Sequence, residues 1–253
     1  MGKVFLDQVL RFAMKSRRLA VNPAEEVDLP RKSPAERRYL THRQVLQLAL
    51  AADRFGVLVM LLAYTGIRYG ESCALRVADV DLEKRRITVS RSATHVAGES
   101  IVETDTKNHS NRVVPVPAFL VDELGPVCED RAGSQLLFPG RHGEHLPLGE
   151  FRWVFDQATE AVGLEGVVPH ALRHTAASLA ISAGANVKVV QRMLGHKTAT
   201  LTLDLYGHLF DDDLDPVADA LNRAAGAAAD LLRTEQGSTS HDEQLHGPQP
   251  ASS

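Results

Sequence analysis

The chain has 253 residues, of which 44% are hydrophobic and 24% are charged. This composition is typical of a globular protein with one large domain or two small ones, and it excludes disorder throughout. The longest apolar run without a charge, residues 55–67, is shorter than the about 20 residues that cross a bilayer, and no secretory segment follows Met1. We therefore expect a cytoplasmic protein with no membrane partner.

The charge is divided unevenly along the chain. Residues 1–203 carry 26 basic and 22 acidic side chains, a balance of +4, whereas residues 204–253 carry 2 and 10, a balance of −8. The net charge of −4 therefore hides a mildly basic body. Basic pairs near the start, at residues 17–18, 31–32 and 37–38, would contact phosphates if they share a face, but a solvated helix and linker explains them equally well.

Apolar side chains recur at helical spacing over residues 3–20, which predicts one amphipathic helix. The polar stretch from Pro23 to Pro34 is typical of a linker. The main domain is expected to begin near residue 40, where Thr41 and Gln44 form a capping box at the start of a helix. Further helices are predicted over residues 54–64 and 70–75.

Between residues 80 and 117 the pattern changes to short runs of strand-forming residues between turns. Residues 87–90, 100–104 and 112–116 predict a three-stranded antiparallel sheet, with a tight loop at residues 105–110 that carries Lys107. Helices are then predicted over residues 118–131, 148–162, 170–183, 187–194, 199–206 and 215–233. The expected fold class is mainly α with one small antiparallel sheet (α+β), followed by a disordered tail over residues 235–253.

Common catalytic signatures are absent from the sequence. It contains no G-x-x-x-x-G-K-[ST], G-x-G-x-x-G, H-E-x-x-H or G-x-S-x-G motif, which are typical of nucleotide-binding proteins, zinc proteases and serine hydrolases. The two cysteines, Cys73 and Cys128, lie far apart, so they predict neither a disulfide framework nor a cysteine-based zinc site.

Arginine and histidine gather in the later motifs. His170, Arg173 and His174 share one face at the start of a predicted helix. A cationic face at a helix N-terminus suits an anion, because free N–H groups and the helix dipole add to its positive potential. His196 follows the end of the next predicted helix, and Tyr206 comes ten residues later beside Gly207, where backbone mobility is easy.

Five motifs together resemble the ordered motif set of the tyrosine recombinases, the phage integrase family. They are Thr65-Gly-Ile-Arg68-Tyr-Gly-Glu71, Lys107 in a turn, His170-x-x-Arg173-His174, Leu194-Gly-His196 and Tyr206. Any one of them arises often, whereas five in this order over about 140 residues are specific. The resemblance extends from about residue 36 to 215 and implies a catalytic domain over residues 35–234. Within the family, the motif sequences are similar to those of bacterial prophage integrases.

The resemblance implies a mechanism. Tyr206 would attack a scissile DNA phosphodiester, giving a 3′-phosphotyrosyl bond and a free 5′-hydroxyl, so that rejoining needs no ATP. Arg68 and Arg173 would bind the non-bridging oxygens in the transition state, so neither a metal nor another cofactor is expected.

The remaining motif residues would support this chemistry. His170 would act as general base or acid near Tyr206, and Lys107 would protonate the leaving 5′-oxygen. His196 would donate a hydrogen bond to the phosphate, and Glu71 would orient the cationic cluster from behind. In the family, positions such as His174 and His208 look structural or supporting, so they stay outside the predicted catalytic set.

Alternative interpretations of the same residues remain. Glu71 is equally placed to be an i, i+3 partner of Arg68 on a helix surface, and Lys107 to be a solvated turn lysine. His170 and His174, with His196 or His208 as a third ligand, would suit a histidine-dependent metallohydrolase. Against this hypothesis, Ala171 stands where H-E-x-x-H sites carry their glutamate, and Arg173 repels a cation.

Integrases of this type carry a helical core-binding domain before the catalytic domain. Residues 1–34 resemble its last helix and linker, so we expect a chain truncated at the N-terminus. The expected partners are double-stranded DNA and a homo-tetramer on paired DNA sites, with accessory DNA-bending or excision proteins. A catalytically crippled DNA-binding remnant is the main alternative. The acidic residues 211–215 and the helix after them are expected to pack on a neighbouring subunit, as they do in the family.

Overall fold

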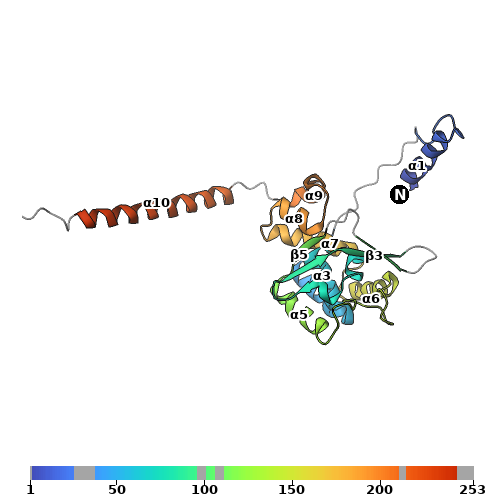
Figure 1. Ribbon diagram of the computed structural model, residues 1–253, viewed down its shortest axis with the longest axis horizontal. Helices are drawn as coiled ribbons and strands as arrows, with labels where there is room; N and C mark the ends of the chain where they lie inside the picture. Colours follow the sequence, from blue (N-terminus) through green and yellow to red (C-terminus); the bar gives the residue numbers. More distant parts are fainter. Residues whose placement is uncertain (1, 26–37, 96–100, 106–110, 211–214, 244–253) are drawn as a thin grey trace, which may run out of the picture. The chain divides into compact units, whose positions relative to one another are not determined.

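The computed structural model describes residues 2–25, 38–95, 101–105, 111–210 and 215–243 (Figure 1). The chain divides into two compact units, Met1–Arg38 and Tyr39–Ser253. No helix within the described ranges has the length and apolar character needed to cross a membrane.

The small unit contains helix α1, Gly2–Lys15. It ends before the predicted residue 20 because Arg17 adopts a left-handed φ of 56°, which an α-helix cannot include. The carboxylate of Asp7 accepts hydrogen bonds from Arg11 Nε at 2.8 Å and from Asn22 Nδ2 at 2.7 Å. The chain after α1 therefore folds back along the helix.

The large unit begins with helices α2 (His42–Ala51), α3 (Gly56–Thr65) and α4 (Tyr69–Cys73), close to their predicted bounds. The predicted capping box is present, since the side chain of Thr41 caps Gln44 and Gln44 bonds back to Thr41. Helix α3 is apolar on almost every side and nearly all of it is buried. It therefore forms the centre of the core.

The strands pair differently from the prediction. Strands β1 (Val80–Asp81), β2 (Arg86–Val89) and β5 (Arg112–Pro115) form an antiparallel sheet in the order β1-β2-β5. The prediction that residues 100–104 join this sheet was wrong, because β4 (Ile101–Asp105) pairs with β3 (Arg91–His95) in a separate ribbon. Alternation along a strand indicates which face is apolar but does not identify the partner strand.

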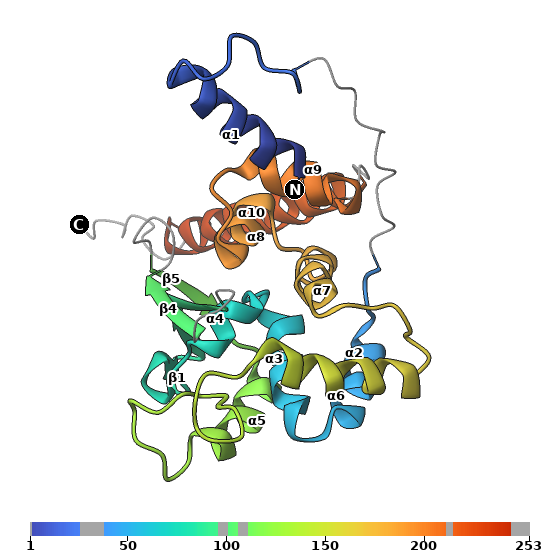
Figure 2. The ribbon, with the colours of Figure 1, turned by 90° about the vertical axis from the view of Figure 1, so that its right-hand side faces the viewer.

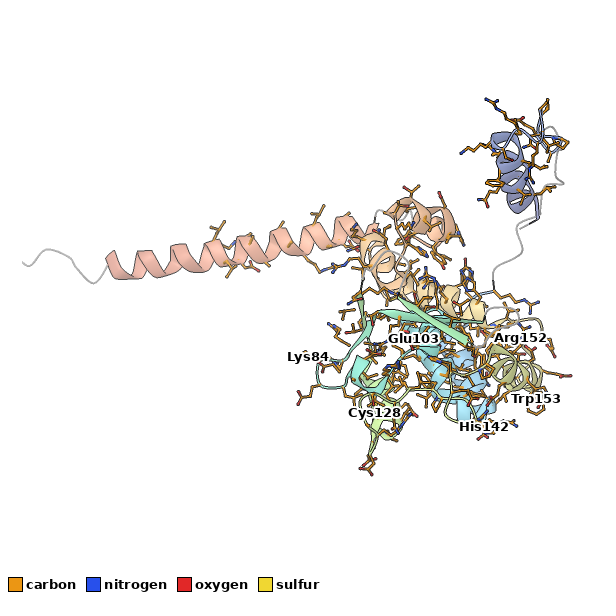
Figure 3. All side chains as sticks on the ribbon, turned by 45° about the vertical axis from the view of Figure 1, so that its right-hand side comes forward. Lys84, Glu103, Cys128, His142, Arg152 and Trp153 are labelled. Carbon is orange, nitrogen blue, oxygen red and sulfur yellow. The ribbon has the colours of Figure 1, made fainter. Side chains whose placement is uncertain are left out.

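Side-chain contacts explain the two sheets. In the first, Ile87 lies opposite Val114 and both are fully buried, so apolar packing sets the β2–β5 register. The ribbon instead carries Glu103, which Figure 3 labels. Its carboxylate accepts a hydrogen bond from Arg76 Nη2 at 3.1 Å and contacts His145 Nε2 at 2.9 Å. Polar contacts thus fasten β4 to the loops beside it.

Helices make up most of the remaining described chain. Their bounds match the predicted ranges closely for α5 to α9 and reproduce two of them residue for residue: α5 (Ala118–Cys128), α6 (Leu148–Ala161), α7 (Pro169–Ser182), α8 (Val187–Leu194) and α9 (Ala199–Tyr206). The local signals are strong at α8 and α9, where Asn186 and Thr198 cap the first turns with their side chains.

The last helix, α10 (Asp215–Glu243), is longer than predicted. Residues 235–243 are helical, so the prediction of a disordered tail from residue 235 was wrong for this part. An established helix adds each further residue at little cost compared with nucleation, so it extends past its alanine-rich start. Leu221, Leu231 and Leu232 on α10 are exposed.

Helix α7 lies between α3 and the α8–α9 pair (Figure 2). Helix α8 also packs on β5, so residues from the central helix, the sheet and the C-terminal helices meet at one place. The predicted mainly helical fold class is confirmed, with small antiparallel sheets beside the core.

Candidate active site

Arg68 lies in the sharp turn between α3 and α4. Gly66 ends α3 with a left-handed φ of 65°, and a Cβ there would lie 2.5 Å from Leu194 Cδ2. Only glycine therefore allows both the turn and the close approach of α8. The Arg68 side chain is 45% exposed and its Nη1 donates to Glu71 Oε1 at 2.9 Å.

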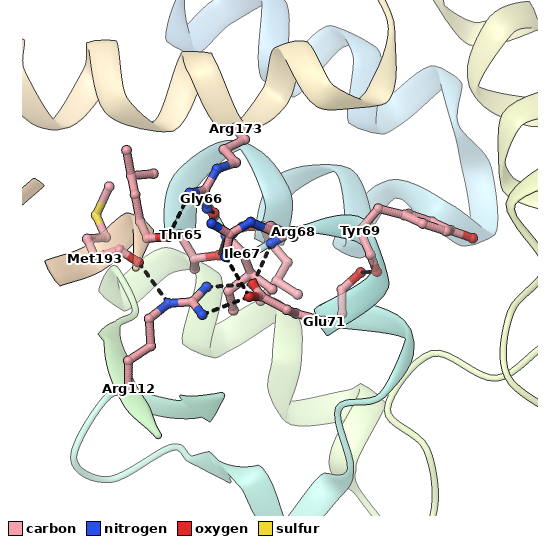
Figure 4. A network of polar contacts seen from close by, with 12 residues as sticks. Thr65, Gly66, Ile67, Arg68, Tyr69, Glu71, Arg112, Arg173 and Met193 are labelled. Carbon is pink, nitrogen blue, oxygen red and sulfur yellow. Dashed lines mark hydrogen bonds and ion pairs between the residues drawn. The ribbon is translucent and has the colours of Figure 1, made fainter. Parts of the chain in front are cut away.

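Glu71 is buried and carries the only carboxylate among four charged residues that we call the arginine–glutamate cluster: Arg68, Glu71, Arg112 and Arg173 (Figure 4). Besides Arg68, it accepts two hydrogen bonds from Arg112, at 2.9 and 2.6 Å. Burial alone would raise the pKa of Glu71, but the hydrogen bonds and charges of Arg112 and Arg68 hold it below its usual value. The carboxylate therefore stays ionised.

Arg112 is a member of this cluster that the sequence did not reveal. It opens β5, and its Nε also donates to the Met193 carbonyl at 3.1 Å, so it joins the sheet, α4 and the end of α8. The only sequence signal is an arginine at the start of an apolar strand, which is common. Its partner Glu71 is 41 residues away, and only the fold brings the two together.

Arg173 closes the cluster from α7. Arg173 is 4% exposed, and its guanidinium donates to the Gly66 carbonyl and, at 2.6 Å, to the Leu194 carbonyl. Burial and the nearby charge of Arg68 lower the pKa of Arg173 to about 9, so it remains protonated at neutral pH. With three guanidinium groups and one carboxylate, the cluster has a surplus of two positive charges that favours an anion.

An apolar cavity opens beside the cluster. It has a volume of about 390 Å³ and is lined by Leu62, Ile67, Arg68, Tyr69, Leu148, Arg152, Val168, Pro169, His170 and Arg173. Pro169 is the first residue of α7, so His170 stands at the helix N-terminus, on the cavity wall. Burial, followed by the charges of Arg173 and Arg68, lowers the pKa of His170 and keeps it neutral.

His196 follows α8 at the left-handed Gly195, whose φ is 66°. Its Nδ1 lies 3.0 Å from Thr202 Oγ1 on α9, a hydroxyl that is fully buried. Burial and the charge of Arg173 lower the pKa of His196 to about 4. The imidazole is therefore neutral at pH 7.

Tyr206 is the last residue of α9. The sequence predicts easy backbone movement at this position, but the residue is only 1% exposed. Its ring stacks on His196 with 6.4 Å between ring centroids, and its hydroxyl oxygen lies 2.8 Å from His174 Nδ1. Together with His170, whose ring centroid is 5.0 Å from that of His174, these residues form what we call the histidine–tyrosine cluster.

The structure thus brings six of the seven predicted site residues to one place: Arg68, Glu71, His170, Arg173, His196 and Tyr206. Lys107 lies outside the described residues. His174, which the sequence analysis left out of the catalytic set, contacts Tyr206, whereas His208 contacts the Tyr39 hydroxyl at 3.1 Å. Within the described part of the chain, no group of three or more His, Cys, Asp or Glu side chains is arranged to hold a metal ion.

Residues 38–212 match the phage integrase family. The chain is 31% identical over 205 residues to the tyrosine recombinase XerC of Roseiflexus castenholzii, covering 74% of this chain and 60% of that protein. It is 30% identical over 218 residues to XerC of Mycobacterium tuberculosis strain H37Ra, covering 78% and 67%. The chain thus spans about 60% of the length of the Roseiflexus relative.

Solved structures show the same fold. The Tn1549 transposon integrase in complex with a circular intermediate DNA matches with a TM-score of 0.71 and 22% identity, covering 87% of this chain and 77% of that one. The catalytic domain of bacteriophage HP1 integrase matches with a TM-score of 0.51 and 26% identity, covering 73% and 95%.

Proposed function

This chain belongs to the phage integrase family, and we propose that it is a site-specific recombinase that cleaves and rejoins DNA through a 3′-phosphotyrosyl intermediate. The observation that carries the proposal is the meeting of the two clusters. Cations with a surplus of two positive charges lie beside a tyrosine whose hydroxyl contacts His174 and whose ring stacks on the neutral His196. An anion binder beside a nucleophile is what phosphoryl transfer requires.

Arg68 and Arg173 have complementary roles in this proposal. Arg68 is half-exposed at the cavity, so its guanidinium is accessible to a non-bridging phosphate oxygen. Arg173 is fixed by two main-chain carbonyls, so it meets developing charge without reorganising. Glu71 and Arg112 hold this arrangement from behind. No metal or other cofactor is required for such a step.

The histidines and Lys107 complete the proposed mechanism. His196 is neutral, and when its Nδ1 accepts from Thr202 its proton is on Nε2, where it can be donated to the phosphate. His170, also neutral, faces the cavity and serves proton transfer there. Lys107, our proposed general acid, protonates the 5′-oxygen as the P–O5′ bond breaks.

The proposed substrate is double-stranded DNA, bound by a homo-tetramer that holds two sites together, with accessory DNA-bending or excision proteins. Two kinds of known protein support DNA as the substrate: the relatives named as tyrosine recombinases and the Tn1549 integrase solved with DNA. Site-specific recombination is common to the recombinases and integrases among them, so we propose it without assigning a chromosomal or a prophage role.

A nicked suicide substrate tests the proposal. We would incubate the chain in EDTA with nicked duplexes that tile the DNA flanking its gene, and resolve the products on a denaturing gel. The expected result is a covalent adduct through a 3′-phosphate, abolished in Tyr206→Phe. Tyr64→Phe is the matched control, because it also removes a tyrosine hydroxyl, but one that contacts His42 rather than the histidine–tyrosine cluster. Binding without an adduct would favour the DNA-binding remnant, and an equal adduct in Tyr206→Phe would refute the nucleophile.

A further inference from the structure

The Tyr206 hydroxyl and His174 are in hydrogen-bonding contact. The distance from His174 Nδ1 to Tyr206 Oη is 2.8 Å, and the two ring centroids are 5.7 Å apart. The two residues come from different helices, α7 and α9, and lie 32 positions apart. A phenol O–H that contacts an imidazole nitrogen donates to it when that nitrogen carries no proton.

His174 and His170 face different surroundings although they lie one helical turn apart. His170 is on the wall of the open cavity, with Arg68 and Arg173. His174 is half-buried, and its Nδ1 is directed at the tyrosine hydroxyl. Of these two histidines, the geometry therefore pairs His174 with the nucleophile and His170 with the place where we put the phosphate.

The ring of Tyr206 also packs against a second histidine. His196 stacks on its ring with an interplanar angle of 4°, and His196 itself contacts Thr202, one turn before Tyr206 on α9. Tyr206 thus packs near two imidazoles and is almost fully removed from solvent. Solvent water has little access to the hydroxyl, so the proton has to leave through a protein group.

We propose that His174 is the general base that takes the hydroxyl proton of Tyr206. As the Tyr206 oxygen bonds to phosphorus, its proton passes to His174 Nδ1, which becomes an imidazolium. The P–O5′ bond breaks and the 5′-oxygen takes a proton from the general acid, for which we proposed Lys107. On rejoining, the 5′-hydroxyl attacks phosphorus and its proton returns to the deprotonated general acid, while His174 returns its proton to the departing phenol. This inference rests on the proposed function.

The contact itself is measurable without DNA. In ¹⁵N-labelled chain, we expect the imidazole spectrum to show His174 with an unprotonated Nδ1 and a protonated Nε2, and Tyr206→Phe to shift the Nδ1 resonance. His174→Asn identifies the signal, and His142→Asn, at an exposed position, serves as the control that leaves it unchanged. A His174 signal that Tyr206→Phe does not move, or a protonated Nδ1, would overturn the proposal.

Two substitutions separate proton transfer from positioning. The Asn oxygen in His174→Asn can occupy roughly the place of Nδ1 and accept the hydrogen bond, but it cannot take up the proton. His174→Ala removes both functions. We expect both variants to lose covalent cleavage of the nicked substrate by about 10²–10⁴-fold, as for loss of a general base. Cleavage by His174→Asn close to the wild-type rate would reduce His174 to a positioning residue and overturn the proposal.

The two proposals fail differently. An absence of adduct in wild type overturns the recombinase function and the base together. An adduct in wild type that persists undiminished in His174→Ala overturns the base alone. Circular dichroism melts of both variants show whether they fold; if His174→Ala fails to fold, His174→Asn and the spectra of the wild type decide the question.

Discussion

The arginine–glutamate cluster and the histidine–tyrosine cluster are neighbours, but they are held by different forces. In the first, charged groups are fixed by ion pairs and by main-chain carbonyls, as at Glu71 and Arg173. In the second, aromatic rings meet through stacking and single hydrogen bonds, as at His196 and Tyr206. Ion pairs and charged hydrogen bonds thus hold the proposed phosphate-binding side, whereas the proposed nucleophile side depends on weaker contacts although Tyr206 itself is buried.

The largest expected effect is on stability, in the arginine–glutamate cluster. Glu71→Ala leaves the largely buried Arg112 without its carboxylate, so the free energy of unfolding should fall by about 3–5 kcal/mol, measured by urea denaturation. Asp81→Ala removes an exposed partner of Lys84 and is the matched control, with a much smaller expected change. Equal losses of unfolding free energy in the two variants would contradict the stabilising role of the buried Glu71 carboxylate.

The next effect is on the rate of cleavage. Lys107→Ala should slow covalent cleavage about 100-fold, because the 5′-oxygen leaves without its proton. A substrate with a sulfur atom in the 5′-bridging position leaves without protonation and should restore the rate. Lys84→Ala is the control, since it removes a lysine that is paired on the surface. A defect that persists on the sulfur substrate would contradict the role of general acid.

A smaller effect is expected where the histidine–tyrosine cluster is oriented. Thr202→Val keeps the shape of a buried side chain but removes the hydroxyl that contacts His196 Nδ1. We expect cleavage to fall about tenfold, equivalent to about 1.4 kcal/mol, the size of one lost hydrogen bond. Thr198→Val, at the cap of α9, tests whether a general loosening of the helix has the same effect; if it does, the orientation of His196 is not the cause.

The smallest effect concerns acid stability. The folded-state pKa of His196 is lowered to about 4, from 6.5, so the unfolded chain binds more protons between these values. The contribution of neutral His196 to the free energy of unfolding is therefore fully present above pH 6.5 and is lost as the pH falls toward 4. The loss should be about 1 kcal/mol, less than the full shift implies, because solvent screens the half-exposed ring. In His196→Gln, the urea midpoint of unfolding should depend less on pH across this window than in the wild type. An unchanged pH dependence would contradict the lowered pKa of His196.

Local patterns along the chain predict most of the helices and identify the motif residues. Asn186 and Thr198 cap α8 and α9, and Gly66 and Gly195 supply left-handed turns next to Arg68 and His196. Capping and turns depend on residues a few positions apart, so they can be recognised along the chain. The family and the mainly helical fold class followed from such signals and are confirmed.

Tertiary structure decided the pairings. It placed β4 with β3 rather than with β2, joined Arg112 to Glu71 across 41 positions, and set His174 against Tyr206 across 32. None of these contacts has a local signature in the sequence. The pattern of a strand does not identify the strand it pairs with, and a charged residue that becomes buried does not identify its counter-ion. The sequence predicts most of the residues proposed to carry the chemistry, but not Arg112 or the role of His174, because only the packing of α7, α9 and β5 brings these residues into contact.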